Sequence, residues 1–136
     1  MKRRRILLLD DDTRAIETAT ALLEACGFEV TISGRSHGRL EFIAQHRPDL
    51  LLLGVRIPHV AGDEVLTACG QHPALKQVPV LLLSSCDPAY LDDMVRESGV
   101  AGFVRKNRLR EELVPWVTLA LARVPVPSGD QPSRVA

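Results

Sequence analysis

The stretch over residues 48–62, PDLLLLGVRIPHVAG, constrains the fold more than any other part of the chain. Its four consecutive leucines, residues 50–53, form an apolar run that is too short for an ordinary helix. Such a run is typical of a strand that is buried on both faces, in the middle of a parallel sheet. Gly54 follows at the carboxyl end of this strand, the edge at which open α/β sheets bind their ligands. A glycine offers no side chain to a site at that edge.

Further apolar runs predict four more strands, and amphipathic stretches separate them. Strands are expected at residues 5–9, 28–32, 50–53, 78–83 and 101–104, and helices at residues 13–26, 36–46, 62–69, 87–98 and 109–122. Gly27 is placed to end the first helix, and Asp12 or Thr13 to cap its start. This alternation predicts an α/β fold, a doubly wound five-stranded parallel sheet with helices on both faces.

Length and composition indicate one soluble domain. The 136 residues are expected to form a domain over residues 1–123, followed by a disordered, proline-rich tail over residues 124–136. The formal net charge is zero, so the composition gives no support for a nucleic-acid or membrane partner. No apolar run approaches the length of a membrane span. The three cysteines lack metal-type spacing, which indicates reduced thiols and a cytoplasmic location.

Polar side chains stand at the carboxyl ends of three of the expected strands, and a glycine stands at the end of a fourth. They are Asp10 and Asp11, Ser84 and Lys106, with Gly54 at the end of the central strand. The carboxyl ends of parallel strands meet at one edge of the sheet, so these residues are expected to converge. Two carboxylates, a hydroxyl and an ammonium suit a small anion together with a divalent cation. Each residue alone also has a plainer explanation, such as a helix cap or a solvated lysine.

These motifs, in this order, resemble the response-regulator receiver domain of two-component signalling, over residues 5–122. ILLLDDD is similar to the family's acidic strand end, which makes Asp10 and Asp11 the metal-binding pair. VPVLLLSS supplies Ser84 as the family's hydroxyl, and GVAGFVRKN supplies Phe103 as the switch aromatic and Lys106 as the lysine. The resemblance implies a flavodoxin-like sheet with strand order 2-1-3-4-5.

The chain departs from the family pattern at its central position. PDLLLLG resembles the family's third strand, whose last residue is normally the phosphorylated aspartate, and here that residue is Gly54. Asp49 cannot replace it, because Asp49 starts the same strand, roughly 15 Å away at the usual strand rise. Ala61 and Asn107 stand where aspartate and proline are usual. We therefore expect a degenerate receiver, or pseudo-receiver, which signals through protein contacts without aspartyl phosphorylation and is not an enzyme.

Three other interpretations follow from the same residues. A phosphorylated regulator could use another acceptor, such as Asp11 or Ser84. A strand ending in DDD also resembles haloacid-dehalogenase-type phosphatases, but their signature needs Thr or Val at Arg14, and Thr13 is out of step. Cys86, next to the site, could be a redox sensor, although a buried structural thiol is the commoner case.

No cofactor is expected, and Mg²⁺ is disfavoured because the acceptor carboxylate is missing. Asp10 and Asp11 are then expected to bind a metal weakly or not at all. The guanidinium of Arg56, two residues beyond Gly54, can turn back and pair with one of these two carboxylates as a counter-ion, and Lys106 can neutralise the other carboxylate. The alternative is that Arg56 points into solvent.

The resemblance also implies the kind of partner. A histidine kinase, another regulator or a second copy of the chain is expected to contact the face formed by residues 89–99, 101–104 and 109–122. Tyr90 and Trp116 are candidate anchors on this face if they are exposed, with core packing as the alternative role. No nucleic-acid or membrane partner is expected.

Overall fold

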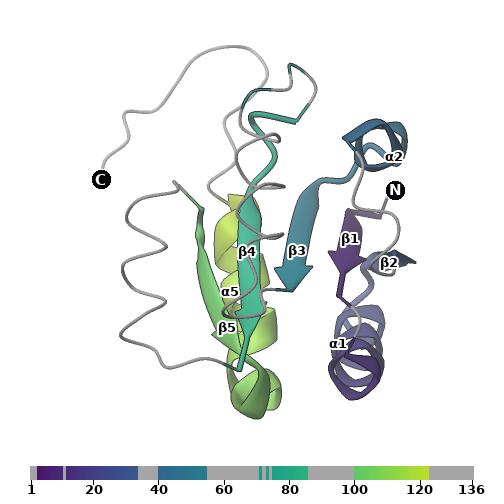
Figure 1. Cartoon of the computed structure of the whole chain (residues 1–136). Helices are drawn as coiled ribbons and strands as arrows, with labels where there is room; N and C mark the ends of the chain where they lie inside the picture. Colours follow the sequence, from purple (N-terminus) through teal and green to yellow (C-terminus); the bar gives the residue numbers. More distant parts are fainter. Residues whose placement is uncertain are drawn as a thin grey trace.

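The computed structural model describes residues 3–10, 12–33, 40–54, 71, 73, 75–85 and 100–122. Within them lies a five-stranded parallel sheet, built from β1 (Arg5–Leu9), β2 (Glu29–Ser33), β3 (Leu50–Gly54), β4 (Val80–Ser84) and β5 (Gly102–Arg105). The strand order is β2-β1-β3-β4-β5, as Figure 1 shows. This order confirms the predicted doubly wound sheet, and each observed strand overlaps its expected range.

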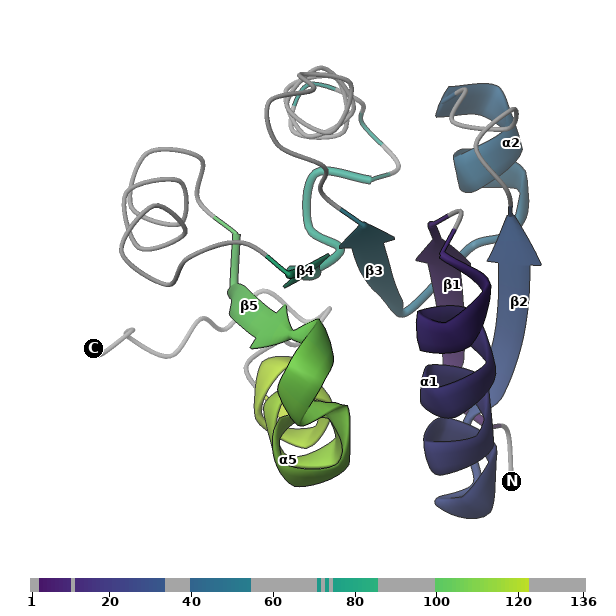
Figure 2. The same ribbon diagram turned by 60° about the horizontal axis from the view of Figure 1, so that its bottom comes forward.

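Helices cover both faces of the sheet. The described helices are α1 (Thr13–Ala25), α2 (Leu40–Gln45) and α5 (Leu109–Ala122), with a 3₁₀ turn, η2 (Lys106–Arg108), before α5. Helices α1 and α5 lie on one face and α2 on the other (Figure 2). None of these described helices is long and apolar enough to cross a membrane. The helices expected at residues 62–69 and 87–98, and the tail over residues 124–136, lie outside the described residues.

Consecutive leucines of the central strands pack into two separate cores. Leu8 and Leu52 belong to the core beneath α1 and α5, whereas Leu7 and Leu51 belong to the core on the side of Ile43 in α2. Successive side chains of a strand point to opposite faces, so a strand covered on both faces must be apolar at every position. This arrangement is the physical reason for the unbroken leucine runs in β1 and β3.

Local polar contacts set the ends of the first helix and of the central strands. Asp12 caps α1 by accepting a hydrogen bond from the Ala15 N–H at 3.2 Å, and the helix ends before Gly27, whose φ of +92° suits glycine. At the opposite edge of the sheet from Gly54, Asp49 Oδ2 accepts a hydrogen bond from the Arg5 N–H at 2.7 Å. Asp49 therefore ties the starts of β1 and β3 together, far from the carboxyl ends.

Trp116 packs in the contact between α5 and β5. Its side chain is partly buried against the core beneath α1 and α5. The six-membered part of its ring lies over Gly102, where an added Cβ would come within 2.5 Å of Trp116 Cζ3. The sequence left two roles open for Trp116, core packing and an exposed anchor, and the structure shows the packing role.

Gly102→Ala is expected to destabilise the protein, because its new methyl group would overlap the indole ring of Trp116. Overpacking of this kind typically costs about 1–3 kcal/mol in the free energy of unfolding. Chemical denaturation of Gly102→Ala, alone and in a Trp116→Leu background, measures the effect. The loss should be smaller in the Trp116→Leu background, and an equal loss in both would contradict the assigned contact.

Candidate functional site

The strand register brings residues 10 and 54 side by side at the carboxyl edge of the sheet. Leu9 pairs with Leu53, so Asp10 lies one step further on, level with Gly54. By strand alternation both positions have the orientation of Leu8 and Leu52, which belong to the core beneath α1 and α5. A side chain at either position therefore projects toward the same face.

The carboxylate of Asp10 lies in the room that a side chain at residue 54 would need. A Cβ built on Gly54 would be 2.4 Å from Asp10 Cγ, 2.5 Å from Oδ1 and 2.9 Å from Oδ2. Real Cβ atoms essentially never approach another group so closely. The Asp10 side chain is only 6% exposed. The space left by the glycine is thus filled from the neighbouring strand.

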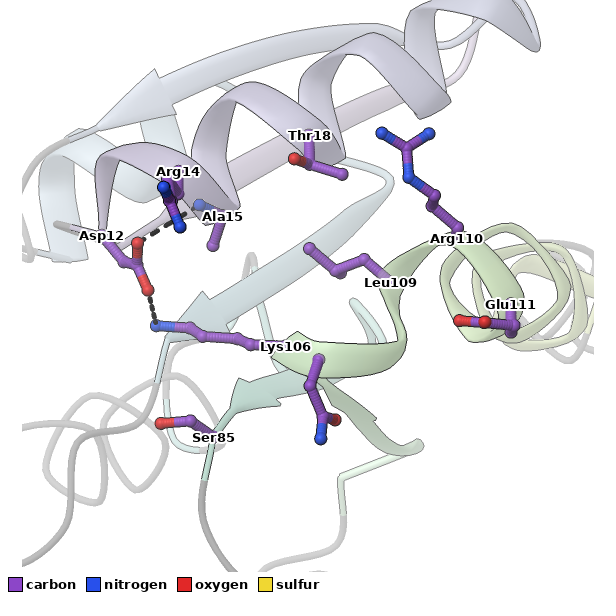
Figure 3. A pocket seen from close by; sticks show the side chains of 10 residues that line it. Asp12, Arg14, Ala15, Thr18, Ser85, Lys106, Leu109, Arg110 and Glu111 are labelled. Carbon is purple, nitrogen blue, oxygen red and sulfur yellow. Dashed lines mark hydrogen bonds and ion pairs between the residues drawn. The ribbon is translucent and has the colours of Figure 1, made fainter.

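Lys106 pairs with two carboxylates at this edge. Its Nζ lies 2.9 Å from Asp10 Oδ2 and 3.2 Å from Asp12 Oδ2. Figure 3 shows the lysine extending from η2 toward the first turn of α1, where Asp12 also caps the helix. The hydrogen bond from Ala15 N–H and, to a smaller extent, the Lys106 ammonium lower the pKa of Asp12, against an opposing effect of burial. We call these three residues the Asp10–Lys106–Asp12 triad.

The structure brings together three of the site residues expected from the sequence, Asp10, Gly54 and Lys106. Ser84 is the last residue of β4 and is fully buried. Phe103, in β5, is partly buried against the core on the α2 side. Asp11 and Arg56 lie outside the described residues, so the expected ion network through Arg56 remains a prediction.

Asp12 is the site residue that the sequence did not reveal. Its position in the DDD run was explained by its role as a helix cap, and the structure shows that one oxygen caps α1 while the other pairs with Lys106. The only available signal was the third consecutive carboxylate after β1. Helix capping orients the Asp12 side chain, and this orientation directs the second oxygen toward Lys106.

A pocket of about 470 Å³ opens beside the triad, between α1 and the start of α5 (Figure 3). Its lining includes Asp12, Arg14 and Thr18 from the α1 side, Ser85 after β4, and Lys106, Asn107 and Arg110 from the η2–α5 side. Among the described residues, no group of three or more histidines, cysteines, aspartates and glutamates is placed to hold a metal ion. The charged contacts that the structure shows in this part of the site are the ion pairs of Lys106 with Asp10 and Asp12.

A second ion cluster positions the segment that carries Lys106. Glu112 Oε2 lies 2.5 Å from Arg105 Nη2 and 3.4 Å from Arg108 Nε, and Glu112 Oε1 accepts a hydrogen bond from the Arg105 N–H at 3.4 Å. The hydrogen bond from the Arg105 guanidinium is the main reason why the pKa of Glu112 is lowered. Glu112 thus fastens both flanks of the turn at Lys106 to the first turns of α5.

Glu112→Gln is expected to lower stability at neutral pH and to have no effect in acid. The pKa of Glu112 is lower in the folded protein than in the unfolded chain. The ionised side chain therefore stabilises the fold at pH values above the ordinary pKa of glutamate, and this stabilisation is lost as the pH falls through the pKa of the folded state. For a partly solvated ion pair the loss is roughly 0.5 kcal/mol. Denaturation curves at several pH values measure it, with Glu111→Gln as a control for the same charge change. An effect of Glu112→Gln that does not vary with pH would contradict the ion-pair role.

The chain is similar to known signalling proteins over nearly its whole length. Residues 6–118 match the family model of the response regulator receiver domain. The chain is 30% identical over 133 residues to the DNA-binding response regulator MtrA of Mycolicibacterium paratuberculosis, which covers 98% of this chain and 56% of MtrA. The chain thus spans about half the length of this relative.

Solved structures agree with this match. A putative response regulator from Chloroflexus aurantiacus superposes with a TM-score of 0.79 at 29% identity, covering 90% of this chain and 100% of that one. The BeF3-activated receiver domain of Klebsiella pneumoniae RstA superposes with a TM-score of 0.74 at 26% identity, covering 87% of this chain and 98% of that one. Together with the strand order and the matched segment, these similarities show that the chain belongs to the response regulator receiver domain family.

Proposed function

We propose that this chain is a pseudo-receiver, a cytoplasmic receiver domain that signals through protein–protein contacts without phosphorylation of an aspartate. The observation that carries this proposal is Gly54 at the carboxyl end of β3, where the Asp10 carboxylate occupies the space that a side chain at residue 54 would need. The proposed role is that of a binding module, and no reaction is assigned to the pocket.

The chemistry of phosphoryl transfer supports the proposal. Transfer to a receiver needs an oxygen nucleophile that can meet the phosphodonor, and covalent catalysis of this kind depends on its position. Gly54 has no such group, and Asp49 is held at the other edge of the sheet by the Arg5 N–H. The hydroxyl of Ser84 belongs to a fully buried residue, which disfavours it as a substitute acceptor.

The protein is expected to remain unmodified when it is incubated with a small-molecule phosphodonor and MgCl2. Intact-mass spectrometry under conditions that preserve acyl phosphates would detect the addition of one phosphoryl group. A receiver that contains the acceptor aspartate, treated in parallel, shows that the donor is active.

Gly54→Asp is the matched gain-of-function variant, because it restores only the missing carboxylate. It is expected to acquire the phosphoryl group to a measurable extent once its new side chain has displaced Asp10. A stoichiometric phosphoryl adduct on any aspartate of the unmodified protein would overturn the proposal.

The proposed contact surface is the side of α5 that lies next to β5. Glu112, Trp116 and Leu119 follow one another at helical spacing, so they lie along one side of α5. Leu119 is 44% exposed, and Trp116, one turn before it on the same side of α5, packs on Gly102 of β5. A large exposed apolar side chain next to a tryptophan suits the centre of a small protein interface. The proposed partner is a histidine kinase, another regulator or a second copy of this chain.

Leu119→Glu is expected to weaken self-association, which sedimentation velocity over a range of protein concentrations would measure. Ile32→Glu is the matched control, because Ile32 is 46% exposed and lies on β2, at the other edge of the sheet. The control should associate like the unmodified protein. A protein that is monomeric at every concentration would exclude the second copy as the partner, and equal effects of both variants would exclude this surface.

A further inference from the structure

We propose that the Asp10 carboxylate substitutes for the missing carboxylate at residue 54. In this role it holds the pocket in one arrangement, and neither Mg²⁺ binding nor phosphorylation is needed to establish that arrangement. The inference extends the proposed function to the regulation of the same pocket, and its meaning for signalling rests on that function.

The glycine at residue 54 and the side chain of Asp10 are matched in space. The three atoms nearest to an added Cβ at Gly54 all belong to the carboxyl group of Asp10, at 2.4 to 2.9 Å. The Asp10 side chain keeps this inward position with only 6% of its surface exposed, although it stands at the edge of the sheet. Any residue other than glycine at position 54 would have to push the carboxylate away. Gly54 and the orientation of Asp10 therefore depend on each other.

The charge of Lys106 keeps the Asp10 carboxylate in this position. A buried carboxylate is unfavourable unless a cation or several hydrogen-bond donors compensate it. The Lys106 ammonium, itself only 16% exposed, does so at 2.9 Å and reaches Asp12 at 3.2 Å. The triad thus joins the ends of β1 and β5 to the start of α1. All three groups of the triad belong to the chain itself.

A Mg²⁺ ion at this site would compete with Lys106 for the same oxygen of Asp10. The family resemblance implies a Mg²⁺ held by an acidic pair together with the residue-54 carboxylate. Mg²⁺ needs oxygen ligands at about 2.0–2.1 Å in octahedral geometry, and it repels a nearby ammonium. In this chain residue 54 gives no oxygen from a side chain, and Asp10 Oδ2 already pairs with Lys106. The described residues therefore do not fit a Mg²⁺ site unless the triad opens.

A double-mutant cycle tests the substitution directly. The four proteins are the unmodified chain, Gly54→Ala, Asp10→Ala and the double variant, and the measured quantity is the equilibrium constant for unfolding in denaturant. Gly54→Ala is expected to raise this constant roughly tenfold in the unmodified chain. In the Asp10→Ala background, where no carboxyl group remains to be displaced, the same change should have less than about a third of that effect.

Asp10→Asn provides the second background, and it also serves if Asp10→Ala does not fold. The amide has the shape of the carboxylate but not its charge, so Gly54→Ala should remain costly there, as in the unmodified chain. A Gly54→Ala effect that is the same in the Asp10→Ala background as in the unmodified chain, or that disappears in the Asp10→Asn background, would overturn the proposal.

Calorimetric titration with MgCl2 tests the claim about the metal. The unmodified protein should show no saturable binding up to millimolar MgCl2, and binding with submillimolar affinity would overturn the proposal. The predictions for the double-mutant cycle and for the phosphodonor experiment can be contradicted independently of each other. If the protein is not phosphorylated and the cycle shows no coupling between residues 10 and 54, only the substitution by Asp10 is refuted. If the cycle shows coupling and the protein is phosphorylated, only the pseudo-receiver function is refuted.

Discussion

The ammonium of Lys106, shared between Asp10 and Asp12, is the contact on which the rest of the candidate site depends. Asp10 follows β1, Asp12 caps α1, and Lys106 follows β5, so one cation connects segments that are almost a hundred residues apart in the sequence. The connection is partly buried, which makes it more sensitive to the loss of one partner than a surface ion pair would be. Glu112 supports this contact, because its ion pairs with Arg105 and Arg108 hold the residues on both sides of Lys106.

The absence of a side chain at Gly54 has not left a void at the centre of the site. Protein interiors are close-packed, and a vacancy at the edge of the sheet is filled by the nearest group that can reach it. In this chain that group is the carboxylate of Asp10, which lies level with Gly54 on the adjacent strand. The glycine at residue 54 therefore has two chemical consequences. It offers no side-chain oxygen at this position, and the Asp10 carboxylate occupies the space and pairs with Lys106.

Much of the fold could be predicted from sequence patterns, with small errors at the boundaries. Residues 5–9 were expected as a strand and form β1, because a short apolar run ending in aspartates has few alternatives. The strand expected at residues 78–83 begins instead at Val80, since Pro79 lacks the N–H that pairing requires, and it ends at Ser84. The role of Trp116 remained open, because the helical period places it on a side of α5 but does not show that Gly102 lies opposite.

The sequence by itself indicated which segments form strands, which groups stand at their carboxyl ends and that residue 54 is a glycine, because periodicity and residue type are local properties of the chain. The order of the strands in the sheet was implied by the family resemblance, and the structure shows it. Only the tertiary structure decided which groups pair. The position of the Asp10 carboxylate over Gly54, and the double role of Asp12 as a helix cap and a partner of Lys106, depend on side-chain rotamers. Those rotamers are selected by neighbours on other strands and helices, through steric room and charge, and no pattern within one segment contains that information.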